Sequence, residues 1–215
     1  MFAMISLSIA SLLEFGLMLA GLVLAVMIHE VAHGWVAFRC GDPTAKIMGR
    51  LTLNPLKHID KYGSIIVPAV LLLVNSPALF GWAKPVPINL NRCRNPKDAL
   101  FQVSIAGPMS NLLQAILALV ILKIIGPANH WFSFFFICYA QTNVMLMAFN
   151  LIPIPPLDGS RVLLSLLPPQ GQDILLRMER YSMFILAIIL FTGALDPFLQ
   201  AIHEGFCQLA LAFLN

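Results

Sequence analysis

Three residues near the end of the first apolar run have the types and spacing needed to bind a metal ion and move a proton. They are His29, Glu30 and His33, in a His-Glu-x-x-His pattern. Residues four apart share one face of a helix, so both imidazoles can reach one ion. The adjacent carboxylate can take a proton from water at that ion. Ionisable side chains inside an apolar segment are costly and by default functional. The pattern therefore predicts a metal site within a membrane helix.

A third protein ligand is needed, because a catalytic zinc site keeps three protein ligands and one open position. The run Asn150–Gly159 contains three prolines, which must end a helix and leave irregular backbone beside a protein-lined cavity. Asp158 in this run is expected on the cytoplasmic side, level with His29 and His33. His58, in the loop after the first helix, is the second choice for this position.

The composition excludes a soluble domain. The chain has 215 residues, of which 59% are hydrophobic and 11% are charged, whereas soluble domains carry about 25% charged residues. The sequence therefore predicts one membrane-embedded domain over 1–215, with a catalytic core at about 15–165 and C-terminal helices at about 174–214. The net charge of +3 and the scattered basic residues argue against nucleic acid as a partner. The four cysteines lack the spacing of a disulfide framework or a zinc site.

The basic residues predict the orientation of the chain. Twelve of the thirteen Lys and Arg residues lie within 39–61, 82–98 and 157–180. The positive-inside rule places all three stretches in the cytoplasm. The metal site is then expected close to the cytoplasmic face of a multi-pass cell-membrane protein.

The fold class expected is an all-α membrane protein with about five to six hydrophobic segments. The apolar runs are 15–38, 62–80, 99–125, 131–149, 181–195 and 198–214. The run 62–80 is interrupted by prolines, so it is expected to be re-entrant, with an ordinary span as the alternative. Residues 1–13 are too short to span alone, and 198–214 could lie in the interface. Short β-like strands are expected only at 44–54 and 85–89.

Several motifs together resemble the site-2 protease family of intramembrane zinc metalloproteases. They are HExxH at 29–33, GDPTA at 41–45, LNPLKHID at 53–60, FGWAKPVP at 80–87, GxxxN ending at Asn111, and NxxPxxPLDG from Asn150. The resemblance covers about residues 15–165. It implies that His29, His33 and Asp158 bind one Zn²⁺ and that Glu30 is the general acid and base. It further implies that Asn111 and Asn150 line the site and hold the substrate backbone or the oxyanion.

By the same resemblance, the partners would be a transmembrane protein substrate and the lipid bilayer, with regulation by another membrane protein. The location would be the bacterial cytoplasmic membrane. The alternatives are a membrane zinc transporter and an inactive scaffold relative. Glu30 within the HExxH pattern argues against both, because neither needs a general base.

Overall fold

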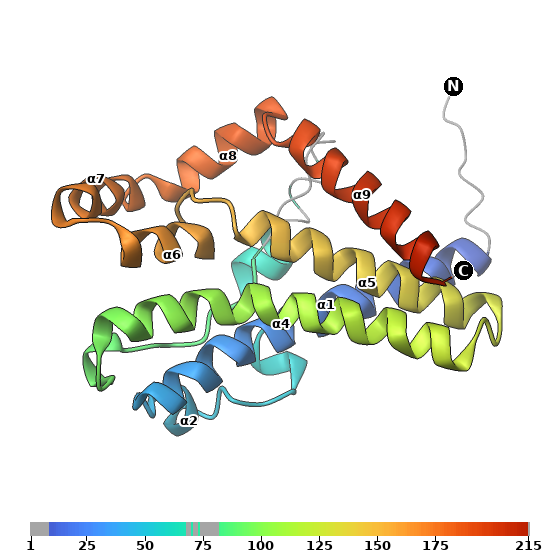
Figure 1. Ribbon diagram of the computed structural model, residues 1–215, viewed down its shortest axis with the longest axis horizontal. Coiled ribbons are helices and arrows are strands. Elements are labelled where there is room, and N and C mark those ends of the chain that lie inside the picture. Colours follow the sequence, from blue (N-terminus) through green and yellow to red (C-terminus); the bar gives the residue numbers. More distant parts are fainter. Residues whose placement is uncertain (1–8, 68–69, 71–72, 74–81, 215) are drawn as a thin grey trace.

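Three long helices form the centre of the protein, as Figure 1 shows: α1 (Ile9–Cys40), α4 (Pro96–Ile125) and α5 (His130–Asn150). The computed structural model describes residues 9–67, 70, 73 and 82–214. Each of the three helices contacts the other two. Their shared core consists largely of small side chains, with Ala25, Ala115, Ala118 and Ala140 all nearly inaccessible. Small residues let helix backbones approach closely, which is how helices associate in a membrane.

Local signals set the ends of these helices. The α1 helix is followed by Gly41, whose φ of +116° is unfavourable for other residues. The side chain of Asn95 caps α4, and Pro96 occupies its first turn. Gly126, with φ of +74°, ends α4, and Asn129 caps α5 by accepting a hydrogen bond from the Phe132 amide at 2.9 Å. The helical hairpin predicted over 99–125 and 131–149 is confirmed.

The expected strands are wrong, since the described residues contain helices and irregular segments but no strand. Residues 44–54 begin with the short α2 (Thr44–Ile47) and continue through turns. Residues 85–89 form neither a helix nor a strand. Pro85 and Pro87 have no N–H to donate to a ladder, which explains why no strand pairs with this segment.

Short helices occupy the loops between α1 and α4. They are α2, the 3₁₀ turns η1 (Pro55–Lys57) and η3 (Leu90–Arg92), and the π-helical η2 (Lys61–Ile66). Most of the segment 62–80, predicted to be re-entrant, lies outside the described residues, as do residues 1–8.

The C-terminal part contains four helices, of which two were expected. They are α6 (Asp158–Leu166), α7 (Pro169–Glu179), α8 (Ser182–Thr192) and α9 (Asp196–Leu214). The helices predicted at 181–195 and 198–214 correspond to α8 and α9. Gly193, in the left-handed conformation, ends α8, and the chain bends by 72° before α9.

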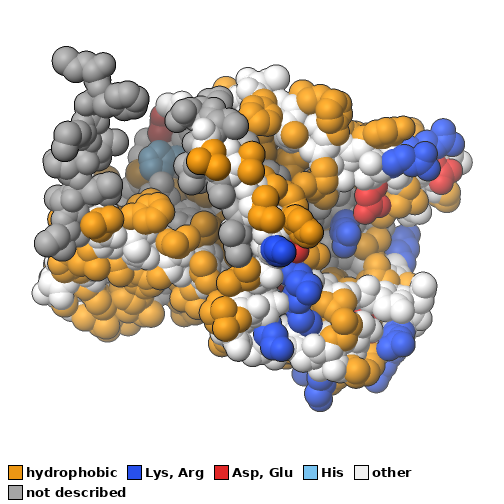
Figure 2. Space-filling model, turned by 180° about the vertical axis from the view of Figure 1, so that it is seen from behind, with side chains coloured by type: hydrophobic (Ala, Val, Ile, Leu, Met, Phe, Trp, Pro, Cys, Tyr) orange, Lys and Arg blue, Asp and Glu red, His pale blue; other side chains and the backbone are white. Residues whose placement is uncertain are grey.

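The expected count of five to six membrane segments is too high for the described residues. Three helices, α1, α4 and α5, are long and apolar enough to cross a membrane, and α8 with α9 adds a fourth if the bent pair is one span. The counts differ because 181–195 and 198–214 form one bent pair, and because most of the run 62–80 lies outside the described residues. Lys and Arg side chains gather toward the end of the molecule that carries α2 and α7, while hydrophobic side chains cover much of the remaining surface (Figure 2).

Candidate functional site

The two histidines of α1 lie at its interior face, close to its C-terminal end. His29 and His33 have exposures of only 7% and 8%. Their Nε2 atoms are 3.0 Å apart, as expected for residues four apart on a helix. The rings therefore point at one common location against α4.

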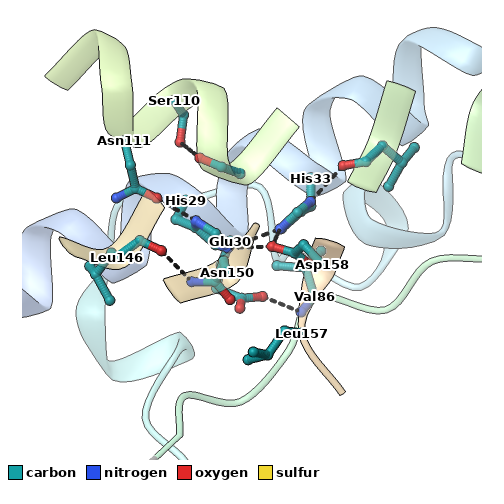
Figure 3. Close-up of polar contacts among 12 residues, drawn as sticks. His29, Glu30, His33, Val86, Ser110, Asn111, Leu146, Asn150, Leu157 and Asp158 are labelled. Atoms are coloured by element: carbon teal, nitrogen blue, oxygen red, sulfur yellow. Dashed lines mark hydrogen bonds and ion pairs between the residues drawn. The ribbon is translucent and has the colours of Figure 1, made fainter. Parts of the chain in front are cut away.

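Asp158 is brought to the same location by the end of α5. That helix ends at Asn150, and residues 151–157, which include the three prolines, form turns before α6 begins at Asp158. The Asp158 Oδ2 atom lies 3.1 Å from the Nε2 of His29 and 3.2 Å from the Nε2 of His33. Figure 3 shows the three side chains pointing toward one another. They are also the one group in the described part of the chain that could hold a metal ion.

The chemistry of these donor atoms fits a cation. The Nδ1 of His33 lies 2.6 Å from the Val103 carbonyl, and the Nδ1 of His29 lies 2.5 Å from Oδ1 of Asn111. Both partners are acceptors, so each Nδ1 carries a ring proton, and each ring in its neutral form presents an Nε2 lone pair. Two such lone pairs and a carboxylate oxygen converge on one location, an arrangement that a cation between them stabilises. Ligands at about 2.0–2.1 Å in a tetrahedral zinc site would be about 3.3–3.4 Å apart, close to the observed separations.

Gly107 of α4 leaves space in front of the donor atoms. A Cβ atom at this position would lie 2.3 Å from the Nε2 of His33 and 2.6 Å from the Nε2 of His29. Any side chain there would enter the space that the three donors surround. Because Gly107 has no Cβ, the space among the three donor atoms stays open for an ion.

Glu30 lies beside this group and contacts a loop segment. Its Oε2 accepts a hydrogen bond from the Val86 amide at 3.0 Å. Val86 belongs to residues 84–89, which we call the strap. At its near end, Arg50 donates to the carbonyls of Lys84 and Pro85 at 2.7 and 3.2 Å, and the Lys84 amide donates to the His58 carbonyl at 2.8 Å.

The far end of the strap is held by another buried carboxylate. Asp42 is fully buried and accepts a hydrogen bond from the Asn89 amide at 2.6 Å. It also accepts from the amide and hydroxyl of Thr44. The strap is therefore held at one end by Arg50 and at the other by Asp42, both in the loop after α1, and it contacts Glu30 between these two ends.

Three further residues were predicted for the site, and each has different surroundings: Asn111, Asn150 and His58. Asn111 is fully buried, and its Oδ1 faces the Nδ1 of His29 at 2.5 Å. Asn150 is half-buried and donates from Nδ2 to the Leu146 carbonyl at 2.9 Å. His58, the second choice for a ligand, is buried in the loop and its Nε2 lies 2.9 Å from the Thr52 carbonyl. It is not part of the described group of side chains that could hold a metal ion.

Sequence reasoning missed Arg50, Val86 and Asn143. Arg50 and Val86 contact partners more than thirty residues away in the sequence, and the motif that contains Val86, FGWAKPVP at 80–87, does not show by itself that its backbone bonds Glu30. Asn143 could have been noticed as a polar residue inside an apolar helix, which in a membrane usually marks a hydrogen bond between helices.

Comparisons with known proteins agree with this geometry. The model of peptidase family M50 matches residues 17–128 and 123–193. YwhC of Bacillus subtilis is 39% identical over 207 residues, covering 90% of each chain. Rip2 of Mycolicibacterium smegmatis is 30% identical over 185 residues, covering 85% of this chain and 69% of that protein. Both are named as candidate zinc metalloproteases.

A more distant relative has a similar name. MJ0392 of Methanocaldococcus jannaschii, named a zinc metalloprotease, is 23% identical over 197 residues, which cover 86% of this chain and 48% of that protein. No solved structure matches the chain significantly.

Proposed function

Because the chain belongs to peptidase family M50, the site-2 protease family, we propose that it hydrolyses peptide bonds within or near the transmembrane segments of other membrane proteins. The family makes it a zinc metallopeptidase. The observation that best supports the intramembrane substrate is the position of the HExxH pattern on α1, a helix long and apolar enough to cross a membrane. A site at this depth can reach bonds that soluble proteases cannot.

His29, His33 and Asp158 are proposed to hold the zinc ion, on the support of their converging donor atoms. When bound, zinc lowers the pKa of water and polarises a carbonyl group. The single negative charge of Asp158 partly offsets the ion in surroundings where charge is costly. Asn111, in turn, is proposed to keep the His29 ring oriented.

Glu30 is proposed as the general base and acid. Its carboxylate would accept a proton from the attacking water and deliver it to the nitrogen of the leaving amine. The hydrogen bond from the Val86 amide fixes one carboxylate oxygen, which supports a defined orientation of the other. Asn150 is proposed to contact the substrate backbone, since its half-buried amide lies at the end of α5 where the irregular segment begins.

The substrate would be a transmembrane helix that unwinds locally before attack. Carbonyl groups in a helix are already hydrogen-bonded and shielded by side chains, so the scissile bond must first leave the helix. Cells that contain the wild-type protein should therefore contain peptide termini that are missing with Glu30→Gln, at positions within or near apolar spans. Mass spectrometry of membrane-protein termini measures this. New termini confined to soluble domains would contradict the proposal.

The site is proposed to lie near the cytoplasmic face of the cell membrane, on the support of the basic residues gathered near α2 and α7 (Figure 2). We expect Arg94→Cys, in a protein without its native cysteines, to resist an impermeant thiol reagent on intact cells. Ala128→Cys, in the exposed turn between α4 and α5, is the matched control and should be labelled. Strong labelling at position 94 with none at position 128 would indicate the opposite orientation in the membrane.

A further inference from the structure

A chain of buried hydrogen bonds runs from the backbone of α5 to the ring of His29, and its first side chain is Asn143. Asn143 is fully buried, as is Asn111 on α4. The Nδ2 of Asn143 donates to the Tyr139 carbonyl at 2.9 Å, and its Oδ1 accepts from the Nδ2 of Asn111 at 2.7 Å. The Oδ1 of Asn111 then faces the Nδ1 of His29 at 2.5 Å.

The direction of every bond in this chain follows from its first member. A backbone carbonyl can only accept, so the amide nitrogen of Asn143 must face Tyr139 and its oxygen must face Asn111. The amide nitrogen of Asn111 must then point at that oxygen, which leaves its own oxygen for His29. The ring proton of His29 is thereby placed on Nδ1, and the lone pair on Nε2 faces Asp158.

We propose that Asn143 is a positioning residue for the metal site, which selects the metal-binding tautomer of His29 through Asn111. This inference rests on the proposed zinc-binding role of His29. Without Asn143, the amide of Asn111 loses the partner that fixes it and can rotate to present its NH₂ group to His29. That orientation favours a proton on Nε2, the atom that must be free for an ion. Asn111 and Asn143 are both fully buried, where an amide group that loses its partner is costly.

Zinc affinity of the purified protein tests this role. Asn143→Ala is expected to weaken zinc binding by about 10–100-fold, the usual loss when a partner beyond the metal ligands is removed. Gln141→Ala is the matched control, because it removes another amide side chain of α5 that bonds a neighbouring helix, from its Nε2 to the Nδ1 of His203 on α9 at 2.8 Å. That variant leaves Tyr139, Asn143 and Asn111 unchanged and should bind zinc as the wild type does.

A double-mutant cycle separates positioning from general loosening of the helices. If Asn143 acts through Asn111, the double variant Asn111→Ala/Asn143→Ala should bind zinc no more weakly than Asn111→Ala alone. Additive losses would overturn the inference. Thermal unfolding of each variant establishes that it is folded.

Nitrogen NMR of histidine-labelled, metal-free protein gives a second readout that is independent of catalysis. Nδ1 of His29 should carry a proton in the wild type, whatever the state of Nε2, and the proton occupancy of Nδ1 should fall in Asn143→Ala. Equal Nδ1 protonation, or equal zinc affinities of Asn143→Ala and the wild type, would overturn this inference alone. A wild-type protein that binds no zinc would overturn the proposed metal site as well.

Discussion

Glu30→Gln is expected to abolish peptide-bond cleavage and to leave one zinc ion per chain. Glutamine has the size of glutamate, and its amide oxygen can still accept the Val86 N–H that Oε2 accepts in the wild type. It cannot take a proton from water at neutral pH, so the step that a general base accelerates by about 10²–10⁴-fold is lost. The measurement combines the cleavage rate of a transmembrane substrate with metal analysis of the same preparation.

Glu14→Gln provides the matched control for this variant. Glu14 lies on the same helix at its other end, where its Oε1 is 3.7 Å from the Nε2 of His130. This substitution makes the same chemical change at the opposite end of α1 from the side chains proposed to hold zinc and should retain cleavage. Full cleavage by Glu30→Gln would contradict the role of Glu30 as general base. A transporter or a scaffold would show no cleavage by the wild type and would keep its function in Glu30→Gln, since neither depends on a base at this position.

Asp158→Ala is expected to lose both zinc and proteolysis, whereas His58→Ala should keep zinc and at least part of the activity. Asp158 supplies one of three converging donor atoms. Its removal should therefore weaken zinc binding more than loss of a supporting residue does, which typically lowers metal affinity about 10–100-fold. His58 instead bonds the Thr52 carbonyl within the loop. Zinc content of the purified variants in detergent measures the difference.

Asp158→Asn adds a comparison at constant shape. It keeps an oxygen in place but removes the charge that offsets the dication, so its zinc binding should also be severely impaired. Thermal unfolding in the same detergent distinguishes metal loss from misfolding. If Asp158→Ala kept stoichiometric zinc and His58→Ala lost it, His58 would be the third ligand and Asp158 would not.

The sequence was sufficient to predict the meeting of α1 with the end of α5. Helical periodicity places His29 and His33 on one face, and the prolines before Asp158 end α5 at the level that the basic residues indicate. The periodicity and the prolines are local features of the chain, and the level follows from the distribution of charge. None of these signals requires knowledge of which helices pack together.

The contacts of Arg50, Val86 and Asn143 could not be predicted in this way. They depend on which surfaces face one another after the helices have packed, and an isolated polar residue does not reveal its partner. The strands expected at 44–54 and 85–89 failed for a related reason. Backbone groups that a neighbouring strand would have satisfied are bonded in the strap by the side chains of Arg50, Glu30 and Asp42.

Attachment of the strap at Asp42 has a consequence for acid tolerance. Burial acts to raise the pKa of Asp42, but hydrogen bonds from Asn89 and Thr44 and the nearby charge of Arg92 outweigh it and hold the pKa below its ordinary value of 3.8. A depressed pKa stabilises the fold above that ordinary value, and this stabilisation is lost only as the pH falls through the lower, folded-state pKa. The strap should therefore stay attached throughout the mildly acidic and neutral range. Changes in cleavage rate between about pH 5 and 8 should therefore not arise from protonation of Asp42 and release of this end of the strap.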